Sequence, residues 1–170
     1  MKLGEPVIRR GDAHDVERIT LLVNRAFEVE AFFVAGDRTT GEQIREKLAT
    51  GVFFIAEKRD RLVGCVHVDR RDRVSAYISM LAVEPSQQGA GIGRQLMRVA
   101  EQYCLQGHCR EVCITVINLR TDLQPFYRSL GYREHGTAPY SDAHRATRPV
   151  HFIVMKKALR RAASDGGAAR

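Results

Sequence analysis

The sequence of 170 residues lacks a long apolar run, paired cysteines and any local concentration of charge. A membrane-spanning helix needs about 18 consecutive apolar residues, and no stretch approaches this length. Residues 1–6 do not contain the apolar run of a signal peptide. The four cysteines show no paired spacing, so a secreted disulfide framework is not indicated. These absences predict a cytoplasmic protein in a reducing compartment, with no membrane partner.

A metal site is also not indicated. Cys104, Cys109 and Cys113 lie near His108, but they are spread over a predicted helix, turn and strand with gaps that match no zinc-ligand pattern. We therefore expect free, buried or half-buried thiols and no bound metal. His67 lies in the interior of a predicted strand and is expected to be a hydrogen-bonded structural histidine.

Positive charge is abundant but dispersed. The chain has 27 Lys and Arg residues against 20 Asp and Glu residues, a net charge of +7. The arginines are spread along the whole sequence and are not interleaved with exposed aromatics, so nucleic-acid binding is not indicated. We expect much of the surplus on a solvated surface, with part of it attracting an acidic cofactor.

Length and hydrophobic periodicity predict one α/β (α+β) domain over residues 1–159, followed by a disordered, glycine-rich tail at 160–170. Short apolar and β-branched runs predict strands at 7–10, 52–56, 62–68, 74–83, 112–117, 132–136 and 150–155. Helical spacing predicts helices at 13–27, 40–51, 92–107 and 123–130, and the first two begin at the capping-box patterns Asp12-x-x-Asp15 and Thr40-x-x-Gln43. The second to fourth strands should form an antiparallel meander.

The most informative stretch is residues 80–96, where an apolar strand ends at Pro85 and three alternate glycines lead into a helix. Glycine lets the backbone approach a ligand closely, and the first amides of a helix have no intrahelical acceptor, so this loop predicts an anion site suited to phosphate. A P-loop would require Lys-Ser/Thr after Gly93, and a dinucleotide fingerprint would require a small residue where Arg94 or Leu96 stands. Neither pattern matches.

Two motifs carry a resemblance to a known family. The segment Gln88-x-x-Gly91-x-Gly93 after an apolar strand resembles the pyrophosphate-binding motif of the GCN5-related N-acetyltransferase (GNAT) family. The segment 125–132, Pro-Phe-Tyr-Arg-Ser-Leu-Gly-Tyr, resembles the second signature of that family. The resemblance spans about residues 5–158. It implies a mixed, mostly antiparallel sheet of about seven strands, splayed between strands 4 and 5, with about four helices and acetyl-CoA in the gap.

The resemblance also implies residue roles. Tyr127 would be the general acid that protonates the departing thiolate, or would only pack. Glu84 would accept a proton from the amine, or would lie in solvent. Tyr127 is also expected to bind the cofactor. The other expected cofactor-binding residues lie at the end of the strand predicted at 74–83, in the glycine loop with the start of the next helix, and after the strand predicted at 112–117: Leu81, Ala82, Val83, Gln88, Gly89, Ala90, Gly91, Ile92, Gly93, Arg94 and Asn118. An extra turn after Asn118 leaves Arg120 either at the cofactor or in solvent.

The expected reaction is direct transfer of an acetyl group from acetyl-CoA to the primary amine of a small molecule. Residues 28–39 either form a connecting loop held in by two phenylalanines or, through their carboxylates and aromatics, a surface for a cationic acceptor. The candidates for binding this acceptor are Glu28, Glu30, Phe33, Asp37 and Tyr140. A protein N-terminal or lysine acetyltransferase would require an open groove between residues 28–39 and 137–149. A non-catalytic acyl-CoA sensor would keep the loop without turnover. Paired subunits are common in the family, so a homodimer is one expected state.

Overall fold

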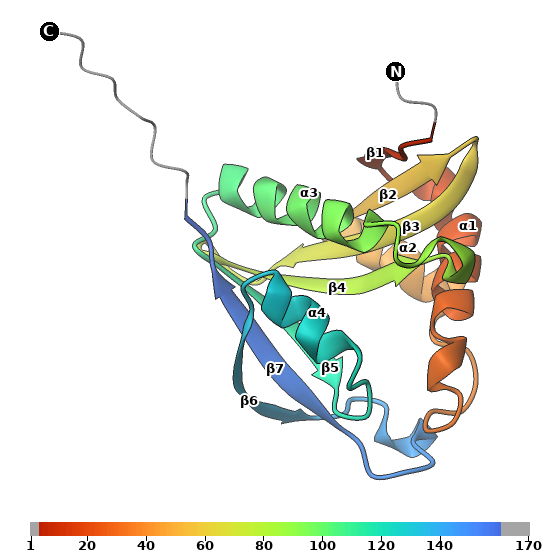
Figure 1. Ribbon diagram of the computed structural model, residues 1–170, viewed down its shortest axis with the longest axis vertical. Helices are drawn as coiled ribbons and strands as arrows, with labels where there is room; N and C mark the ends of the chain where they lie inside the picture. The colour runs from red at the N-terminus through yellow and green to blue at the C-terminus, as the bar shows by residue number, and fades with distance from the viewer. Residues whose placement is uncertain (1–3, 161–170) are drawn as a thin grey trace, which may run out of the picture.

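The computed structural model describes residues 4–160, and these contain one seven-stranded sheet in the order β1-β2-β3-β4-β5-β7-β6 (Figure 1). The strands are β1 (Val7–Arg10), β2 (Val52–Lys58), β3 (Arg61–Arg70), β4 (Ser75–Val83), β5 (Glu111–Ile117), β6 (Arg133–Pro139) and β7 (His151–Ala158). Only β4 and β5 pair in parallel, so the predicted mixed, mostly antiparallel sheet is confirmed. Of the tail predicted at 160–170, residues 161–170 lie outside the described part of the chain.

Within residues 4–160, four α-helices cover the two faces of the sheet: α1 (Val16–Ala26), α2 (Gly41–Thr50), α3 (Ile92–Gln106) and α4 (Leu123–Ser129). Figure 1 shows α3 and α4 in front of the sheet, with α1 and α2 behind it. Each layer buries its own apolar cluster. The larger cluster includes Leu96 and Met97 of α3, and the smaller one includes Ile19 of α1 and Ile44 of α2.

Short 3₁₀ turns complete the structure: η1 (Ala13–Asp15), η2 (Glu28–Glu30), η3 (Pro85–Gln87) and η4 (Ala143–Arg145). Both predicted capping boxes are confirmed, at the start of η1 and at the start of α2. The helix predicted at 13–27 is therefore η1 followed by α1. Arg9 and Arg18 pair with the buried Asp15, and this hydrogen bonding from Arg9 lowers the pKa of the Asp15 carboxyl.

The sheet opens between β4 and β5. These strands pair only where Ser75–Tyr77 lie opposite Glu111–Cys113, whereas β5 pairs with β7 along its whole length. A β-bulge follows in β4: Met80 and Leu81 oppose the single residue Val66 of β3, and Met80 has a positive φ of 51°. The Tyr77 hydroxyl and the Thr115 hydroxyl are 2.5 Å apart across the start of the gap.

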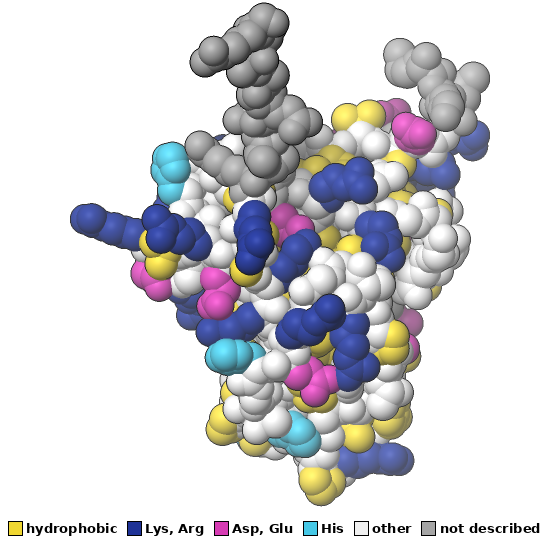
Figure 2. Space-filling model, turned by 60° about the vertical axis from the view of Figure 1, so that its left-hand side comes forward, with side chains coloured by type: hydrophobic (Ala, Val, Ile, Leu, Met, Phe, Trp, Pro, Cys, Tyr) yellow, Lys and Arg dark blue, Asp and Glu magenta, His cyan; other side chains and the backbone are white. Residues whose placement is uncertain are grey.

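The positive charge is dispersed over the surface. Figure 2 shows Lys and Arg side chains scattered over the face that carries β6 and β7, with carboxylates between them. Lys157 pairs with Glu101 at 2.6 Å, and Lys156 pairs with Glu111 at 2.9 Å. This pattern is typical of a solvated surface. Among the helices of residues 4–160, none has the length and apolar character needed to cross a bilayer.

All four cysteines are free thiols; three of them are buried and Cys113 is half-buried. Burial raises the pKa of Cys65 and of Cys104 to about 12. Both thiols therefore stay protonated at neutral pH and behave as small apolar side chains.

Candidate active site

A cleft of about 970 Å³ begins where β4 and β5 separate. Its walls come from β4, β5, the loop before α3, α4, the end of α1 and one side of α2. The structure brings together twelve of the residues that the sequence singled out. These are Glu30, Leu81, Ala82, Val83, Gln88, Gly89, Gly91, Ile92, Gly93, Arg94, Arg120 and Tyr127.

The remaining candidates do not line this cleft: Glu28, Phe33, Asp37, Glu84, Ala90, Asn118 and Tyr140. Glu84 pairs with Arg25 of α1 at 3.0 Å. Asn118 exchanges two hydrogen bonds with the backbone of His151, each 3.0 Å, which tie the end of β5 to the start of β7.

The glycine loop presents backbone amides to the cleft. Gly89 and Gly91 have φ values of 81° and 82°, a left-handed conformation that favours glycine. The amide of Gln95 donates to the carbonyl of Gly91 at 3.0 Å, so the amides of Ile92, Gly93 and Arg94 precede the first bond of α3 and have no intrahelical acceptor. Together with the positive end of the helix dipole, these amides form a site for an anion such as a diphosphate.

The open edge of β4 offers further backbone groups. The amide of Glu84 donates to Val63 of β3 at 2.9 Å, and Ala82 stands opposite Cys65. Because backbone groups along an antiparallel strand point alternately toward and away from the partner strand, Leu81 and Val83 turn theirs toward the cleft. The side-chain amide of Gln88 donates a hydrogen bond to the carbonyl of Val83 at 3.3 Å. The amides of Leu81 and Val83 are therefore available to a ligand, whereas that of Ala82 faces β3.

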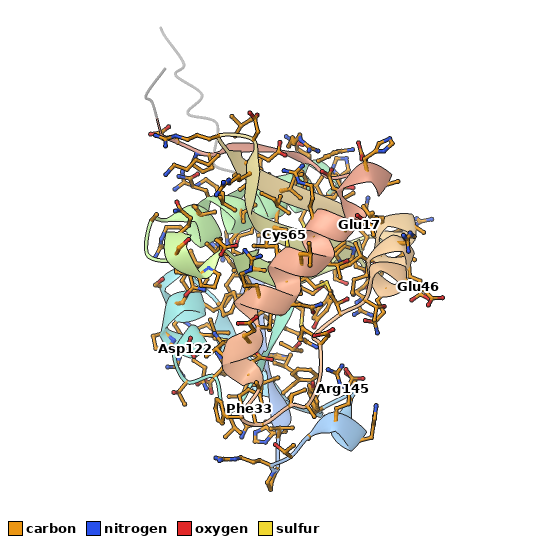
Figure 3. The ribbon with its side chains drawn as sticks, turned by 90° about the vertical axis from the view of Figure 1, so that its right-hand side faces the viewer. Glu17, Phe33, Glu46, Cys65, Asp122 and Arg145 are labelled. Carbon is orange, nitrogen blue, oxygen red and sulfur yellow. The ribbon has the colours of Figure 1, made fainter. Side chains whose placement is uncertain are left out.

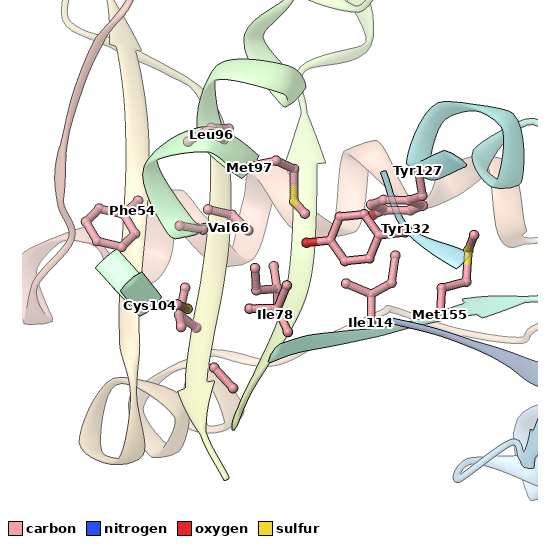
Figure 4. Packing of buried hydrophobic residues seen from close by; sticks show 14 of the residues in the cluster. Phe54, Val66, Ile78, Leu96, Met97, Cys104, Ile114, Tyr127, Tyr132 and Met155 are labelled. Atoms are coloured by element: carbon pink, nitrogen blue, oxygen red, sulfur yellow. The ribbon is translucent and has the colours of Figure 1, made fainter. Parts of the chain in front are cut away.

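Tyr127 forms part of the cleft wall from α4, and its side chain is 8% exposed. Its ring makes edge contacts with Phe126, at a centroid distance of 5.1 Å, and with Tyr132, at 5.8 Å. Figure 4 shows Tyr127 beside Tyr132. The hydroxyl has no hydrogen-bond partner among residues 4–160. Burial raises the pKa of Tyr127 above its ordinary value, so the hydroxyl keeps its proton at neutral pH. The residue is thus a protonated donor in the cleft wall.

Arg120 joins two carboxylates at the cleft. Its guanidinium donates to Glu30 at 3.0 Å and to both carboxylate oxygens of Asp122, at 3.0 and 2.9 Å, and its side chain is 12% exposed. Within the described residues, Oε2 of Glu30 is buried without a hydrogen-bond partner. Burial raises the pKa of Glu30, against the opposing effect of Arg38 and Arg120. The extra turn after Asn118 had indicated Arg120 as a candidate cofactor contact. The sequence did not predict that Arg120 pairs with Glu30 and Asp122.

Two loops that were candidates for an open groove are hydrogen-bonded to each other. The amide of Ala35 donates to the carbonyl of Arg145 at 2.9 Å, and the amide of Thr147 donates to the carbonyl of Phe33 at 2.9 Å. The Arg145 side chain also donates to the carbonyl of Ala35 at 2.9 Å. Figure 3 shows Phe33 and Arg145 at the same end of the molecule. The two loops therefore form a joined wall.

His67 has the structural role expected from its strand position. It is 1% exposed, and its Nε2 lies 3.0 Å from the carbonyl of Lys47 in the last turn of α2. Because a carbonyl only accepts, Nε2 carries the proton, and Nδ1 faces the hydroxyl of Ser79 at 3.4 Å. Burial lowers the pKa of His67 to about 4, so the ring is neutral at pH 7.

Because His67 is buried in its neutral form, we expect the protein to lose stability as the pH falls. Below about pH 6.5 the unfolded chain takes up a proton at this position, whereas the native protein accepts it only near pH 4. Acidification through this window is expected to reduce the free energy of unfolding by about 3 kcal/mol from this group alone. His67→Gln keeps a donor for the Lys47 carbonyl without titrating, and should flatten the profile measured by urea unfolding. An equal pH dependence in both proteins would contradict the prediction, and the exposed-residue variant His135→Gln serves as control.

The splayed mixed sheet, with a glycine loop between β4 and α3, defines the GNAT fold. The sequence matches the description "Acetyltransferase (GNAT) domain" over residues 20–159, and the chain belongs to this family. The resemblance found in the two motifs is therefore confirmed.

Three solved structures show the same fold. The ribosomal-protein-S18-alanine N-acetyltransferase from Escherichia coli is 15% identical, with a TM-score of 0.74 and coverage of 94% of this chain and 97% of that chain. A putative acetyltransferase from Salmonella typhimurium, yncA, was solved with acetyl-CoA and is 17% identical, with the same TM-score and coverage. An aminoglycoside 6'-N-acetyltransferase complexed with coenzyme A is 18% identical, with a TM-score of 0.73 and coverage of 92% and 99%.

Proposed function

We propose that this protein transfers an acetyl group from acetyl-CoA to a primary amine of a small molecule, by direct attack within the cleft. The single observation that carries the proposal is the gap between β4 and β5, which combines unpaired loop amides, an open strand edge and a protonated tyrosine. Solved relatives of the same fold hold acetyl-CoA or coenzyme A.

The residues present fit this cosubstrate. The amides of Ile92, Gly93 and Arg94 hold the diphosphate, and the guanidinium of Arg94 adds positive charge from its position beside Ser129, 3.0 Å away. The backbone groups of Leu81 and the carbonyl of Val83, which has a second lone pair beside its bond to Gln88, pair with the amides of the pantetheine arm, as an added strand would. Acetyl-CoA supplies the activated thioester carbonyl.

Three groups of the chain serve the acyl-transfer step. The amide of Val83 stabilises the oxyanion that forms when the amine attacks the carbonyl. The hydroxyl of Tyr127 donates its proton to the sulfur as the carbon–sulfur bond breaks, so coenzyme A leaves as a thiol. Glu30 accepts the proton of the attacking amine, directly or through water, because it is a cleft-lining carboxylate whose Oε2 accepts no hydrogen bond from the described residues and whose pKa is raised by burial. Glu84 is paired with Arg25 and requires a water relay to take this role.

The joined loops favour a small acceptor. An acceptor on a protein requires a groove through which a polypeptide passes, and here the hydrogen bonds among Phe33, Ala35, Arg145 and Thr147 link residues 28–39 to residues 137–149. Solved relatives include enzymes named for either acceptor class, a ribosomal protein alanine and an aminoglycoside. The wall in this chain supports the small-molecule alternative.

The test is release of free thiol from acetyl-CoA in the presence of polyamines, aminoglycosides, amino acids and peptides. We expect turnover with small amines and none with peptides. Turnover with peptides alone would favour a protein acetyltransferase. Tight binding of acetyl-CoA by calorimetry, with no thiol released by any amine, would favour the sensor.

A further inference from the structure

Lys47 is a half-buried cation without a paired carboxylate. It lies in the last turn of α2 and lines the cleft on the side formed by α2 and β4. Among residues 4–160, no carboxylate oxygen lies within 4.0 Å of its Nζ. Burial lowers the pKa of Lys47, and of the nearby charged groups only Asp69 opposes this effect, while Arg38 and Arg71 add to it.

Two arginines extend this positive region. Arg38 lines the cleft, with its guanidinium 5.2 Å from the ring centre of Phe27 and its Nε 4.0 Å from Glu30. Arg71 lies over the ring of Tyr77 at 4.7 Å, and its Nε is 4.0 Å from Asp69. The Arg38–Glu30 and Arg71–Asp69 distances of 4.0 Å are the longest that count as an ion pair, so the carboxylates neutralise the charge of each arginine only in part.

The position of Lys47 is fixed by the fold. His67 of β3 and the amide of Gly51 both bond to the Lys47 carbonyl, at 3.0 and 2.9 Å. These bonds hold the end of α2 against the sheet, with Lys47 in the same cleft wall as Tyr77 and Ser79 of β4. A cationic side chain that extends from this wall into a partly desolvated cleft is a binding feature, because its charge is weakly screened there.

The acidic residues of the cleft do not cancel this charge. Glu30 and Asp122 both bond to Arg120, and Asp142 belongs to the loop before η4. Glu46 is exposed and lies at the outer edge of α2 in Figure 3. Of the charged groups that act on Lys47 itself, Asp69 is negative, whereas Arg38 and Arg71 are positive, so positive charge exceeds negative charge around this side chain.

We propose that the acceptor is an amine that also carries a carboxylate or phosphate group, and that Lys47 and Arg38 bind this anionic group. The proposal rests on the acetyl-transfer function proposed above and narrows its substrate class. It replaces the cationic acceptor suggested by the composition of residues 28–39, because of those residues only Glu30 and Arg38 line the cleft. When its carboxylate or phosphate is bound, the acceptor molecule directs its amine toward the thioester, and the negative charge of the bound group balances the positive charge around Lys47.

The substrate test uses matched pairs of amines. Amino acids are compared with their carboxamides, and phosphoethanolamine with ethanolamine, by thiol release at equal concentrations of free amine. We expect kcat/KM to be about 10- to 100-fold higher for the anionic member of at least one pair, the range of a charge-assisted hydrogen bond. The pair that discriminates identifies carboxylate or phosphate as the bound group.

The variant test uses Lys47→Gln and Arg38→Gln, with Arg45→Gln as control because Arg45 is an exposed cation of the same helix outside the cleft lining. We expect KM for the anionic acceptor to rise about tenfold or more in the first two variants, with KM for acetyl-CoA and for the neutral partner unchanged. Thermal unfolding verifies that each variant is folded.

The outcomes separate the two proposals. Thiol release without discrimination between anionic and neutral amines, or a Lys47 variant with unchanged KM, overturns the anion site and leaves acetyl transfer standing. Absence of thiol release with every amine overturns both.

Discussion

Replacing Tyr127 with phenylalanine is expected to reduce kcat by about 100-fold or more, the usual contribution of a positioned general acid. The ring contacts with Phe126 and Tyr132 are kept, so only the hydroxyl of this cleft-lining residue is lost. The affinity for acetyl-CoA should change little because the diphosphate and the pantetheine arm bind elsewhere. Thiol release gives kcat, and calorimetry gives the Kd of acetyl-CoA.

The matched control for this substitution is Tyr103→Phe. Tyr103 lies on α3, packs against Phe54 and is absent from the cleft lining. It is expected to retain wild-type kcat. An equal loss of kcat and of acetyl-CoA affinity in Tyr127→Phe would show that the residue packs without donating a proton.

Substitution of Gly91 by alanine is expected to weaken acetyl-CoA binding by about tenfold or more. Alanine in a left-handed conformation costs about 1–2 kcal/mol, and φ at Gly91 is 82°. No atom of the protein lies within 4 Å of the added Cβ, so the methyl group enters open space beside a loop that lines the cleft. Titration calorimetry with acetyl-CoA measures the change.

Gly136→Ala separates the effect of backbone strain from the effect on binding. Gly136 lies in β6 with a φ of 123°, also has no atom near a built Cβ, and does not line the cleft. Both variants should be less stable than the wild type, and only Gly91→Ala should lose affinity for acetyl-CoA. A similar loss of affinity in both would mean that strain, and not the loop amides, explains the result.

Local patterns predicted the parts of the structure that depend on near neighbours in sequence. Asp12 and Thr40 each cap a helix through residues three positions later, so the capping boxes were readable in advance. The alternate glycines at 89, 91 and 93 likewise predicted a loop before α3, and the family resemblance supplied the splay between β4 and β5. Element ends were less accurate: β6 was predicted at 132–136 and is found at Arg133–Pro139.

The part of the cleft proposed to bind the acceptor amine is formed by contacts between segments that are distant in the sequence, and no local pattern encodes such contacts. Arg120 and Glu30 are 90 positions apart in the sequence, and the bond between Arg145 and Ala35 spans 110 positions. Lys47 appeared as one of many charges on an amphipathic helix, and its burial depends on how α2 packs on the sheet. The Met80 bulge has no glycine to mark it, since a residue with a side chain adopts the positive φ there.

The contact between Tyr77 and Thr115 has a thermodynamic consequence for ligand binding. This hydroxyl pair, 2.5 Å apart, bridges the diverging strands in the free protein. The separation of the strands is thus set before any ligand arrives, and an entering thioester does not have to order the two walls. Less conformational entropy is lost on association, so a larger share of the contact energy appears as affinity.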